Sequence, residues 1–146
     1  MFNFKYLLFF AVSLSILTAC SKDDDNGGSA SIIGTWEVES IQLTVAGETF
    51  DELEEIFEDC PGEGQGISTF NEDGTGIGEF RCDGELIETY NFEYELSSDR
   101  KKLSFTESGD TFNYNVDQLT SSRMVLSYEE SFFGITSKVV ETWVRR

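Results

Sequence analysis

Carboxylates and cysteines are the side chains of this sequence that could do chemistry, because its 146 residues contain no histidine. The absence of histidine excludes Ser-His-Asp and Cys-His nucleophilic sites, His-ligated zinc and the commonest proton shuttle at neutral pH. Asp and Glu together number 28, so the inventory allows a hydrolase with two catalytic carboxylates. No spacing places two of them together, however, and an acidic surface is the ordinary explanation.

Two further patterns that could bind ions are incomplete. The glycine-rich stretches 62–66 and 74–78 lack the lysine and the strand–helix context of a phosphate-binding loop. The acidic segment 48–59 does not have the spacing of an EF-hand calcium loop. We therefore expect a protein that is not an enzyme and that has no metal site and no cofactor.

The first twenty residues have the pattern of an export signal. Lys5 is followed by an apolar run from Tyr6 to Leu17, which suits a secretory signal peptide but is shorter than the about 20 apolar residues of a membrane span. A short transmembrane anchor is the alternative that this length disfavours. The stretch LTAC, which ends at Cys20, resembles the lipobox of bacterial lipoproteins. The resemblance implies a lipoprotein signal peptide at residues 1–19 and a lipid on the Cys20 sulfur, each acyl methylene contributing about 0.8 kcal/mol to anchoring.

The segment that follows the cysteine is acidic and has no large apolar side chain. Residues 20–31 include three consecutive aspartates, and this composition is typical of a flexible tether. The stretch SKDDD resembles the acidic tag of surface-displayed lipoproteins of the Bacteroidetes. That likeness implies an outer-membrane protein that is held by its lipid anchor and exposed at the cell surface. The net charge of −18 repels polyanions, so we exclude nucleic-acid binding.

Cys60 and Cys82 remain as a pair in what the signal peptide indicates is an oxidising compartment. Two cysteines in that setting form a disulfide more often than a metal site. A redox role is disfavoured because the pair lacks the CxxC spacing. We predict a disulfide, which for a loop of this length would stabilise the fold by about 3 kcal/mol on the chain-entropy model.

Residues 32–146 have the composition of one folded domain with many strands. Eight apolar–polar segments follow one another with short connections, so each strand should pair with its predecessor. Eight antiparallel strands avoid exposed edges by closing. We predict an all-β fold, an eight-stranded antiparallel up-and-down β-barrel. Its first strand should bend near Ser40, where the apolar parity switches.

Two stretches of the domain give more local predictions. The acidic segment after the first strand places Phe50 and Phe57 on one face at helical spacing, which predicts one short amphipathic helix. The segment 86–96 alternates most clearly, and the alternation places Leu86 and Tyr90 on one buried face, with Glu88 as the exception.

The stretch IIGTWEV (32–38) resembles the Gly-x-Trp signature of lipocalins through Gly34 and Trp36. Together with STFNEDGTG, the cysteine pair and the aromatic-rich strands, it makes the whole domain similar to the lipocalin-like lipoproteins of the Bacteroidetes. The resemblance implies a lipocalin-like, calycin-type barrel in which Trp36 plugs the closed end. It also implies that Arg145 or Arg146 lies across that ring, in a cation–π contact of about 0.5–2 kcal/mol.

Inward-facing aromatic residues support the first of two functional hypotheses, namely that the barrel binds a small hydrophobic or amphipathic ligand. The alternative for each of these residues is simple packing in the core. The candidate ligand-binding residues are Phe92, Tyr94, Phe105, Phe112, Tyr114 and Tyr128.

The second hypothesis is a non-enzymatic surface interaction module with a filled barrel, which contacts a protein or glycan partner at the cell envelope. The acidic segment 48–59 and the adjacent Phe132 and Phe133 support it, because two neighbouring aromatics in a strand connection cannot both point inward. An accessible apolar cavity would favour the ligand carrier, and a filled barrel with an exposed Phe133 would favour the module. We expect a monomer in either case.

Overall fold

The structure, a computed structural model, describes residues 30–146, which form one antiparallel sheet with one short helix. The strands are β1 (Gly34–Val45), β2 (Glu48–Asp51), β3 (Gly64–Phe70), β4 (Thr75–Cys82), β5 (Glu85–Leu96), β6 (Lys102–Glu107), β7 (Asp110–Leu119), β8 (Arg123–Phe132) and β9 (Ile135–Arg145), and the helix is α1 (Glu52–Ile56). No helix of the described region is long and apolar enough to cross a membrane. The expected signal peptide, the lipidation site at Cys20 and nearly all of the tether lie outside the described residues.

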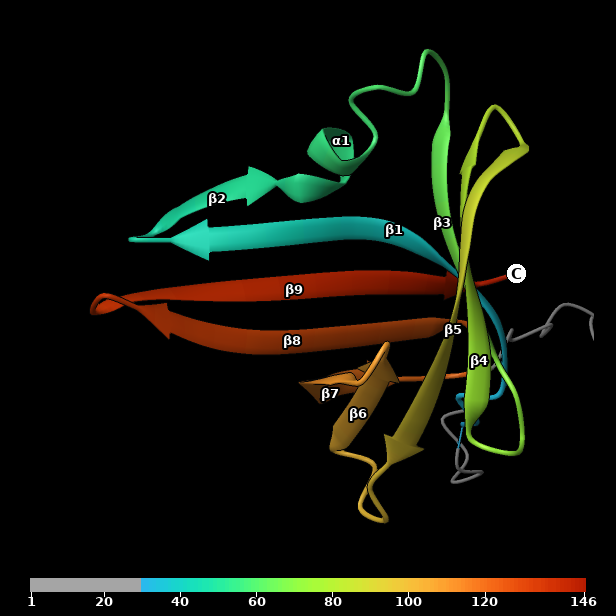
Figure 1. The fold of residues 1–146 in the computed structure, drawn as a ribbon. Helices are drawn as coiled ribbons and strands as arrows, with labels where there is room; N and C mark the ends of the chain where they lie inside the picture. Colours follow the sequence, from blue (N-terminus) through green and yellow to red (C-terminus); the bar gives the residue numbers. More distant parts are fainter. Residues whose placement is uncertain (1–29) are drawn as a thin grey trace, which may run out of the picture.

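Eight of the strands close into a barrel. Each strand from β3 to β9 pairs with the next one, and β1 completes the ring by pairing with β3 on one side and β9 on the other. Figure 1 shows β1 beside β9 along most of its length. The predicted eight-stranded antiparallel up-and-down barrel is confirmed, and β2 extends it as a ninth strand.

β1 bends where the sequence predicts it. Residues 34–37 pair with β3, whereas residues 42–45 pair with β2. In the middle of β1, its register with β9 shifts between Val38 and Ser40. Such a bulge inserts one extra residue and reverses which side chains face inward. As a result, Val38 and Ile41 both line the interior.

The predicted helix begins later than expected. Ala46 and Gly47 form a tight turn with φ values of 51° and 90°, and this turn folds β2 back onto β1. Phe50 therefore lies in a strand and is 49% exposed. The helix starts after Asp51, whose side chain accepts a hydrogen bond from a backbone N–H of the first turn at 3.0 Å. The prediction was wrong for Phe50 because the hairpin turn outweighs the helical spacing of the apolar residues.

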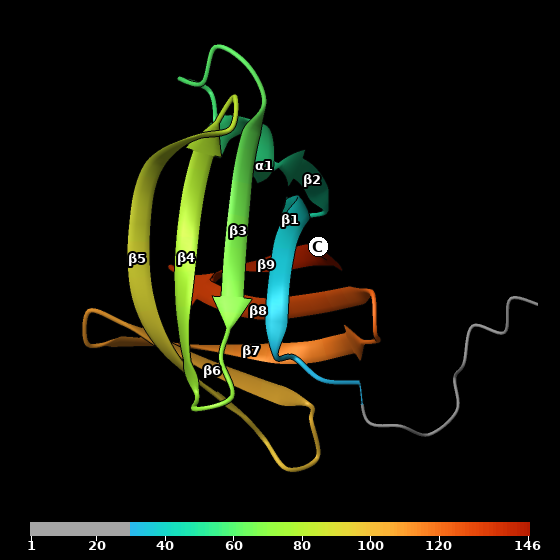
Figure 2. The same cartoon turned by 90° about the vertical axis from the view of Figure 1, so that its right-hand side faces the viewer.

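The barrel splays at one end into two leaves. β5 pairs with β6 only over residues 93–96, so its first part follows β4 alone. On the other side, β1 separates from β3 after Glu37. One leaf consists of β3, β4 and β5, and the other contains β1, β8 and β9. The first leaf therefore crosses β8 and β9 at a steep angle (Figures 1 and 2). We call the splayed end the open end and the opposite end the closed end.

The inward alternation expected for residues 86–96 holds only from Tyr90 onward. The register of β4 with β5 shifts between Phe80 and Arg81, which places Leu86 opposite Arg81. Leu86 is 52% exposed, so its expected burial was wrong. Its neighbour Ile87 is 60% exposed as well, so neither face of this first part of β5, which pairs with β4 alone, is covered.

The hydrophobic core fills the closed end. Trp36, Leu103 and Met124 are at most 1% exposed, and Phe92 belongs to the same cluster. Gly76 faces Phe92 across the β4–β5 pair, and a Cβ at Gly76 would come within 2.2 Å of that ring. A glycine is therefore needed at this position for the ring to lie across the neighbouring strand.

Candidate functional site

Trp36 and Arg145 meet at the closed end of the barrel. Trp36 is fully buried, and its Nε1 donates a hydrogen bond of 2.7 Å to a backbone carbonyl four residues earlier. The guanidinium carbon of Arg145 lies 4.3 Å from the centre of the Trp36 ring. Arg145 also donates to the carbonyls of Ser31, Ile33 and Ser121, the last two at 2.8 and 2.7 Å. One side chain therefore joins the segment before β1, the β7–β8 turn and the last strand.

Gly34 provides the space for this guanidinium. Its φ of 125° is one that side-chain-bearing residues rarely adopt, and a Cβ there would lie 2.3 Å from Arg145 Nη1. Arg146 does not cover the tryptophan, and its side chain instead pairs with Glu37 at 2.8 Å. Of the two arginines proposed to cross Trp36, the structure places Arg145 there.

Cys60 and Cys82 form the predicted disulfide, with their Cα atoms 5.7 Å apart. The bond joins the loop after α1 to the end of β4. Beside it, Phe57 meets Phe80 edge-on, with 6.0 Å between ring centres. Because α1 has no buried residue of its own, these two links hold the helix against the open end.

A cavity of about 270 Å³ lies between the two leaves, adjoining the core. Aromatic rings form much of its wall, together with aliphatic side chains from β1, β3, β6, β8 and α1. The aromatic lining residues are Phe57, Phe70, Phe80, Tyr90, Phe105, Phe112, Tyr114, Tyr128 and Trp143. The polar side chains of the wall are those of Ser68, Glu107 and Glu141, besides the tyrosine hydroxyls.

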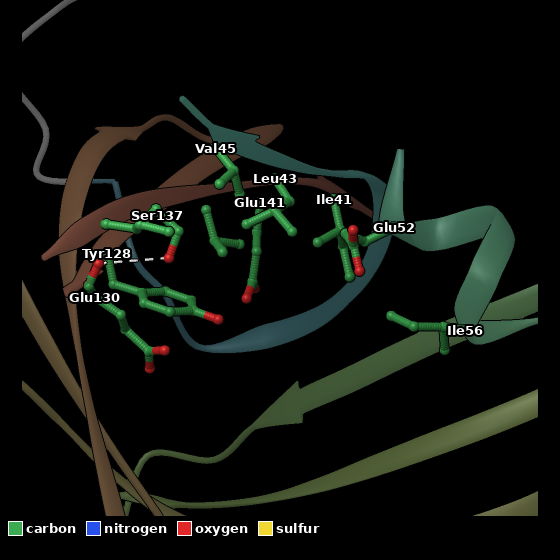
Figure 3. A pocket seen from close by; sticks show the side chains of 11 residues that line it. Ile41, Leu43, Val45, Glu52, Ile56, Tyr128, Glu130, Ser137 and Glu141 are labelled. Atoms are coloured by element: carbon green, nitrogen blue, oxygen red, sulfur yellow. Dashed lines mark hydrogen bonds between the residues drawn. The ribbon is translucent and has the colours of Figure 1, made fainter. Parts of the chain in front are cut away.

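A second, more open hollow of about 570 Å³ adjoins this cavity. Ile41, Ile56, Tyr128 and Glu141 line both spaces, so the two spaces meet at these residues. Figure 3 shows the side chains of Tyr128 and Glu141 directed into the same region, beneath the aliphatic residues of β1. The cavity is thus reached from the open end.

The structure separates the six candidate ligand-binding residues into two groups. Four of them line the cavity, namely Phe105, Phe112, Tyr114 and Tyr128. The other two lie nearer the closed end and line neither space. Phe92 is 3% exposed and stacks on Phe105 with 4.3 Å between ring centres. Tyr94 packs on Phe70 and donates its hydroxyl hydrogen bond to a carbonyl of the β3–β4 turn.

Several lining residues of this cavity were not among the sequence-based candidates, including Phe70, Phe80, Tyr90 and Trp143, and the charged one that lines both spaces is Glu141. It lies on the inward face of β9 between Val139 and Trp143. Trp143 Nε1 donates to Glu141 Oε2 at 3.0 Å, and the Tyr114 hydroxyl lies close enough to this carboxyl group to lower its pKa. Burial raises the pKa of the Glu141 carboxyl, whereas these two contacts oppose the shift. The sequence held one indication of this position. Glu141 precedes Trp143 by two residues and Arg145 by four, and strand residues at that spacing point to the same face.

Three tyrosines surround the same carboxylate. The rings of Tyr114 and Tyr128 meet edge to face with 5.3 Å between centres, and Tyr90 lies across the cavity on β5. Burial raises the pKa of all three hydroxyls, and the negative charge of Glu141 adds to the rise. All three hydroxyls are therefore neutral near pH 7 and available as hydrogen-bond donors or acceptors.

The charged side chains that line the two spaces are all acidic. They are Glu52, Glu107, Glu130 and Glu141. Within residues 30–146, no lysine or arginine lines either space. The same part of the chain contains no group of three or more His, Cys, Asp or Glu side chains that could hold a metal ion. The site is thus an apolar chamber with hydroxyl groups and negative charge.

Comparison with known proteins gives a family match and several distant structural likenesses. The sequence model described as "Lipocalin-like domain" matches residues 32–126. A complex of bovine odorant-binding protein with undecanal is 16% identical, with 82% of this chain and 76% of that one aligned at a TM-score of 0.46. Lobster apocrustacyanin A1 is 12% identical, with 78% and 60% aligned at a TM-score of 0.46. No curated protein sequence gives a significant match.

Proposed function

Because this chain belongs to the lipocalin-like domain family, we propose that its barrel binds a small hydrophobic or amphipathic molecule in the cavity between the two leaves. A shared fold does not by itself establish a function. The observation that supports the proposal is the cavity, because the aromatic residues of the open end leave a space of about 270 Å³. The proposed role is carriage and not catalysis, in keeping with a sequence that has no histidine.

The chemistry of the cavity wall fits a ligand site. Small-molecule sites are concave and mostly apolar, have a few convergent polar groups, and measure about 300–1,000 Å³. At about 270 Å³ this cavity falls just below that range, and its polar groups converge at Glu141 and Tyr114. Trp36 and Arg145 close the far end, so a ligand would enter between the leaves.

We also propose that the domain is held at the outer membrane, exposed at the cell surface, by a lipid on Cys20. The support is the LTAC stretch after an apolar run and the acidic residues that follow. Metabolic labelling with a palmitate analogue should mark the wild-type chain and transfer it to the membrane fraction. Cys20→Ala should lose both label and membrane association, and a labelled Cys20→Ala chain would contradict the proposal.

The ligand proposal is tested by asking what co-purifies with the barrel. Residues 30–146 hold the complete ring of strands and its core, so the chain 21–146, placed behind a signal peptide that is cleaved without lipidation, can be exported and purified. Mass spectrometry of its organic extract should show one stoichiometric small molecule. Ile41→Trp should displace this molecule, because Ile41 lines both the cavity and the outer hollow.

Ile77→Trp is the matched control, since Ile77 is 43% exposed and lines neither of those spaces. A molecule that is lost from the Ile41 variant and kept by the Ile77 variant supports a ligand in the cavity. An empty extract, with no thermal stabilisation by a panel of lipids and hydrophobic compounds, would contradict the proposal.

That negative result would favour an interaction module as the function. One observation supports this second candidate: Phe133, at the tip of the β8–β9 hairpin, is 91% exposed. Cross-linking on intact cells, comparing the wild type with Phe133→Ser, would test it. A cross-linked envelope protein or glycan that disappears in the variant would support this candidate, and an unchanged pattern would contradict it.

A further inference from the structure

We propose that the molecule bound in the cavity carries a positively charged amine, and that the Glu141 carboxylate recognises it. This inference rests on the proposed function, because it names the chemical class of the ligand in the same cavity. It is carried by the position of one acidic side chain and by the sign of the charges around it.

Glu141 is placed where a ligand would contact it. It lines both the cavity and the outer hollow, and its side chain points into the space between them (Figure 3). The hydrogen bond from Trp143 Nε1 holds the carboxyl group in place, and the Tyr114 hydroxyl lies beside it. A carboxylate can accept about four hydrogen bonds, so these two contacts leave acceptor capacity for a ligand.

The charges around Glu141 select the sign of the ligand. Glu52, Glu107 and Glu130 also line the two spaces, and no lysine or arginine of the described residues does. A carboxylate or phosphate ligand would meet only negative charge there, in surroundings of lower polarity than water where repulsion is stronger. An ammonium group would be attracted by the same charges.

The rest of the cavity suits the apolar part of such a ligand. The rings of Phe80 and Phe105, together with Leu126, lie on its wall and provide apolar contact. The faces of Tyr114 and Tyr128 add negative electrostatic potential that favours a nearby cation. The expected ligand is therefore an amphipathic amine, with its ammonium group at Glu141 and its apolar body between the leaves.

A purely structural role for Glu141 makes a different prediction. If the carboxyl group served only to anchor Trp143 and Tyr114, an amide of the same shape would replace it, because the Gln oxygen also accepts a hydrogen bond from Trp143 Nε1. Glu141→Gln would then bind any ligand as the wild type does. Recognition of an amine requires the negative charge.

The experiment is isothermal titration calorimetry on the exported chain 21–146, at pH 7 and below the micellar range, with octylamine, 1-octanol and octanoate as probes. These three share one apolar chain and differ in the charge of the head group. Octylamine should bind about tenfold or more tightly than 1-octanol, since hydrogen bonds to charged groups are the stronger ones. Octanoate should bind most weakly.

Glu141→Gln should weaken octylamine binding by about tenfold or more and leave 1-octanol binding within about twofold. Glu93→Gln, on an exposed position of β5 outside the cavity, should change neither affinity. Octylamine that binds no more tightly than 1-octanol, or equally tightly to Glu141→Gln, overturns the amine assignment and leaves the ligand carrier standing. Failure of all three probes to bind also overturns the amine assignment, and the carrier proposal is then decided by the co-purified extract and the ligand panel described above. The comparison of probes on the wild type holds even if the variant does not fold.

Discussion

The Arg145 guanidinium lies 4.3 Å from the centre of the Trp36 ring, so the last strand of the barrel covers the tryptophan of the first. The two residues come from strands that pair with each other, and Trp36 and Arg145 are direct partners in the β1–β9 register. Their contact therefore lies at the point where the sheet closes on itself.

Arg145→Ala should lower the free energy of unfolding by about 2 kcal/mol, because it removes a cation–π contact and the donors to three backbone carbonyls. Arg146→Ala is the control, since its ion pair with Glu37 is solvent-exposed and should contribute about 0–1 kcal/mol. Urea unfolding followed by tryptophan fluorescence measures both. Equal losses in the two variants would show that Arg145 has no special role in closure.

Gly34→Ala should destabilise the barrel more than Gly47→Ala does. Both glycines have positive φ, at 125° and 90°, but a Cβ at Gly34 would meet Arg145 whereas one at Gly47 has no neighbour within 4 Å. The positive φ alone should cost each alanine variant about 1–3 kcal/mol of stability. In Gly34→Ala, the clash with Arg145 adds to this cost. Combining Gly34→Ala with Arg145→Ala should recover part of the loss. If the losses of the two single variants simply add in the double variant, the clash with Arg145 is not the cause of the Gly34→Ala loss.

Removing the disulfide through Cys60→Ala and Cys82→Ala should lower the free energy of unfolding by about 3 kcal/mol. The effect on local motion should be concentrated in α1, because this helix has no buried residue and is linked to β4 through the disulfide. Amide hydrogen exchange should therefore accelerate over residues 52–60 more than in β8. Uniform acceleration along the whole chain would contradict a local role.

Glu141→Gln should stabilise the barrel at neutral pH relative to the wild type. Burial raises the pKa of the Glu141 carboxyl in the folded protein. At a pH between the ordinary pKa of about 4.3 and the raised pKa, the folded state therefore binds more protons than the unfolded state. The wild type therefore loses stability as pH rises through this window, and the variant avoids that loss. Tyr90, Tyr114 and Tyr128 face the group and stay neutral there.

Urea midpoints measured from pH 4 to pH 8 should show a difference between Glu141→Gln and the wild type that grows with pH and vanishes at the acidic end. Glu93→Gln corrects for removing one negative charge from an acidic protein. A difference that is constant with pH would mean that burial of the charged carboxylate is not its origin.

The parts of the fold that depend on neighbouring residues could be predicted from the sequence. The change of parity between Val38 and Ile41 predicts the bulge in β1, because alternation has a period of two and any break in it is local. The closed barrel follows from the short connections between successive strands. The cysteine pair could be matched because only two cysteines remain after Cys20.

The candidate site depends on register, which distant strands set. The adjacent Leu86 and Ile87 fit either parity, yet both are more than half exposed, because this part of β5 pairs with β4 and not with β6. Glu141 fits either parity as well, because both faces of β9 carry apolar residues around it. The pairing of β9 with β1 and β8 decides which face of β9 points inward. This pairing places Glu141 in the cavity, whereas the sequence shows it only as one acidic residue among many.

The described chain enters the barrel at its closed end, where Arg145 binds the carbonyl of Ser31. β1 then runs for 12 residues toward the open end, a length of about 40 Å at the usual rise of a strand. Through the flexible tether predicted for residues 20–31, a lipid on Cys20 would be attached at the closed end, and the open end would lie at the opposite pole of the domain. The mouth of the cavity would then be far from the attachment point and free to exchange its ligand with the surrounding medium.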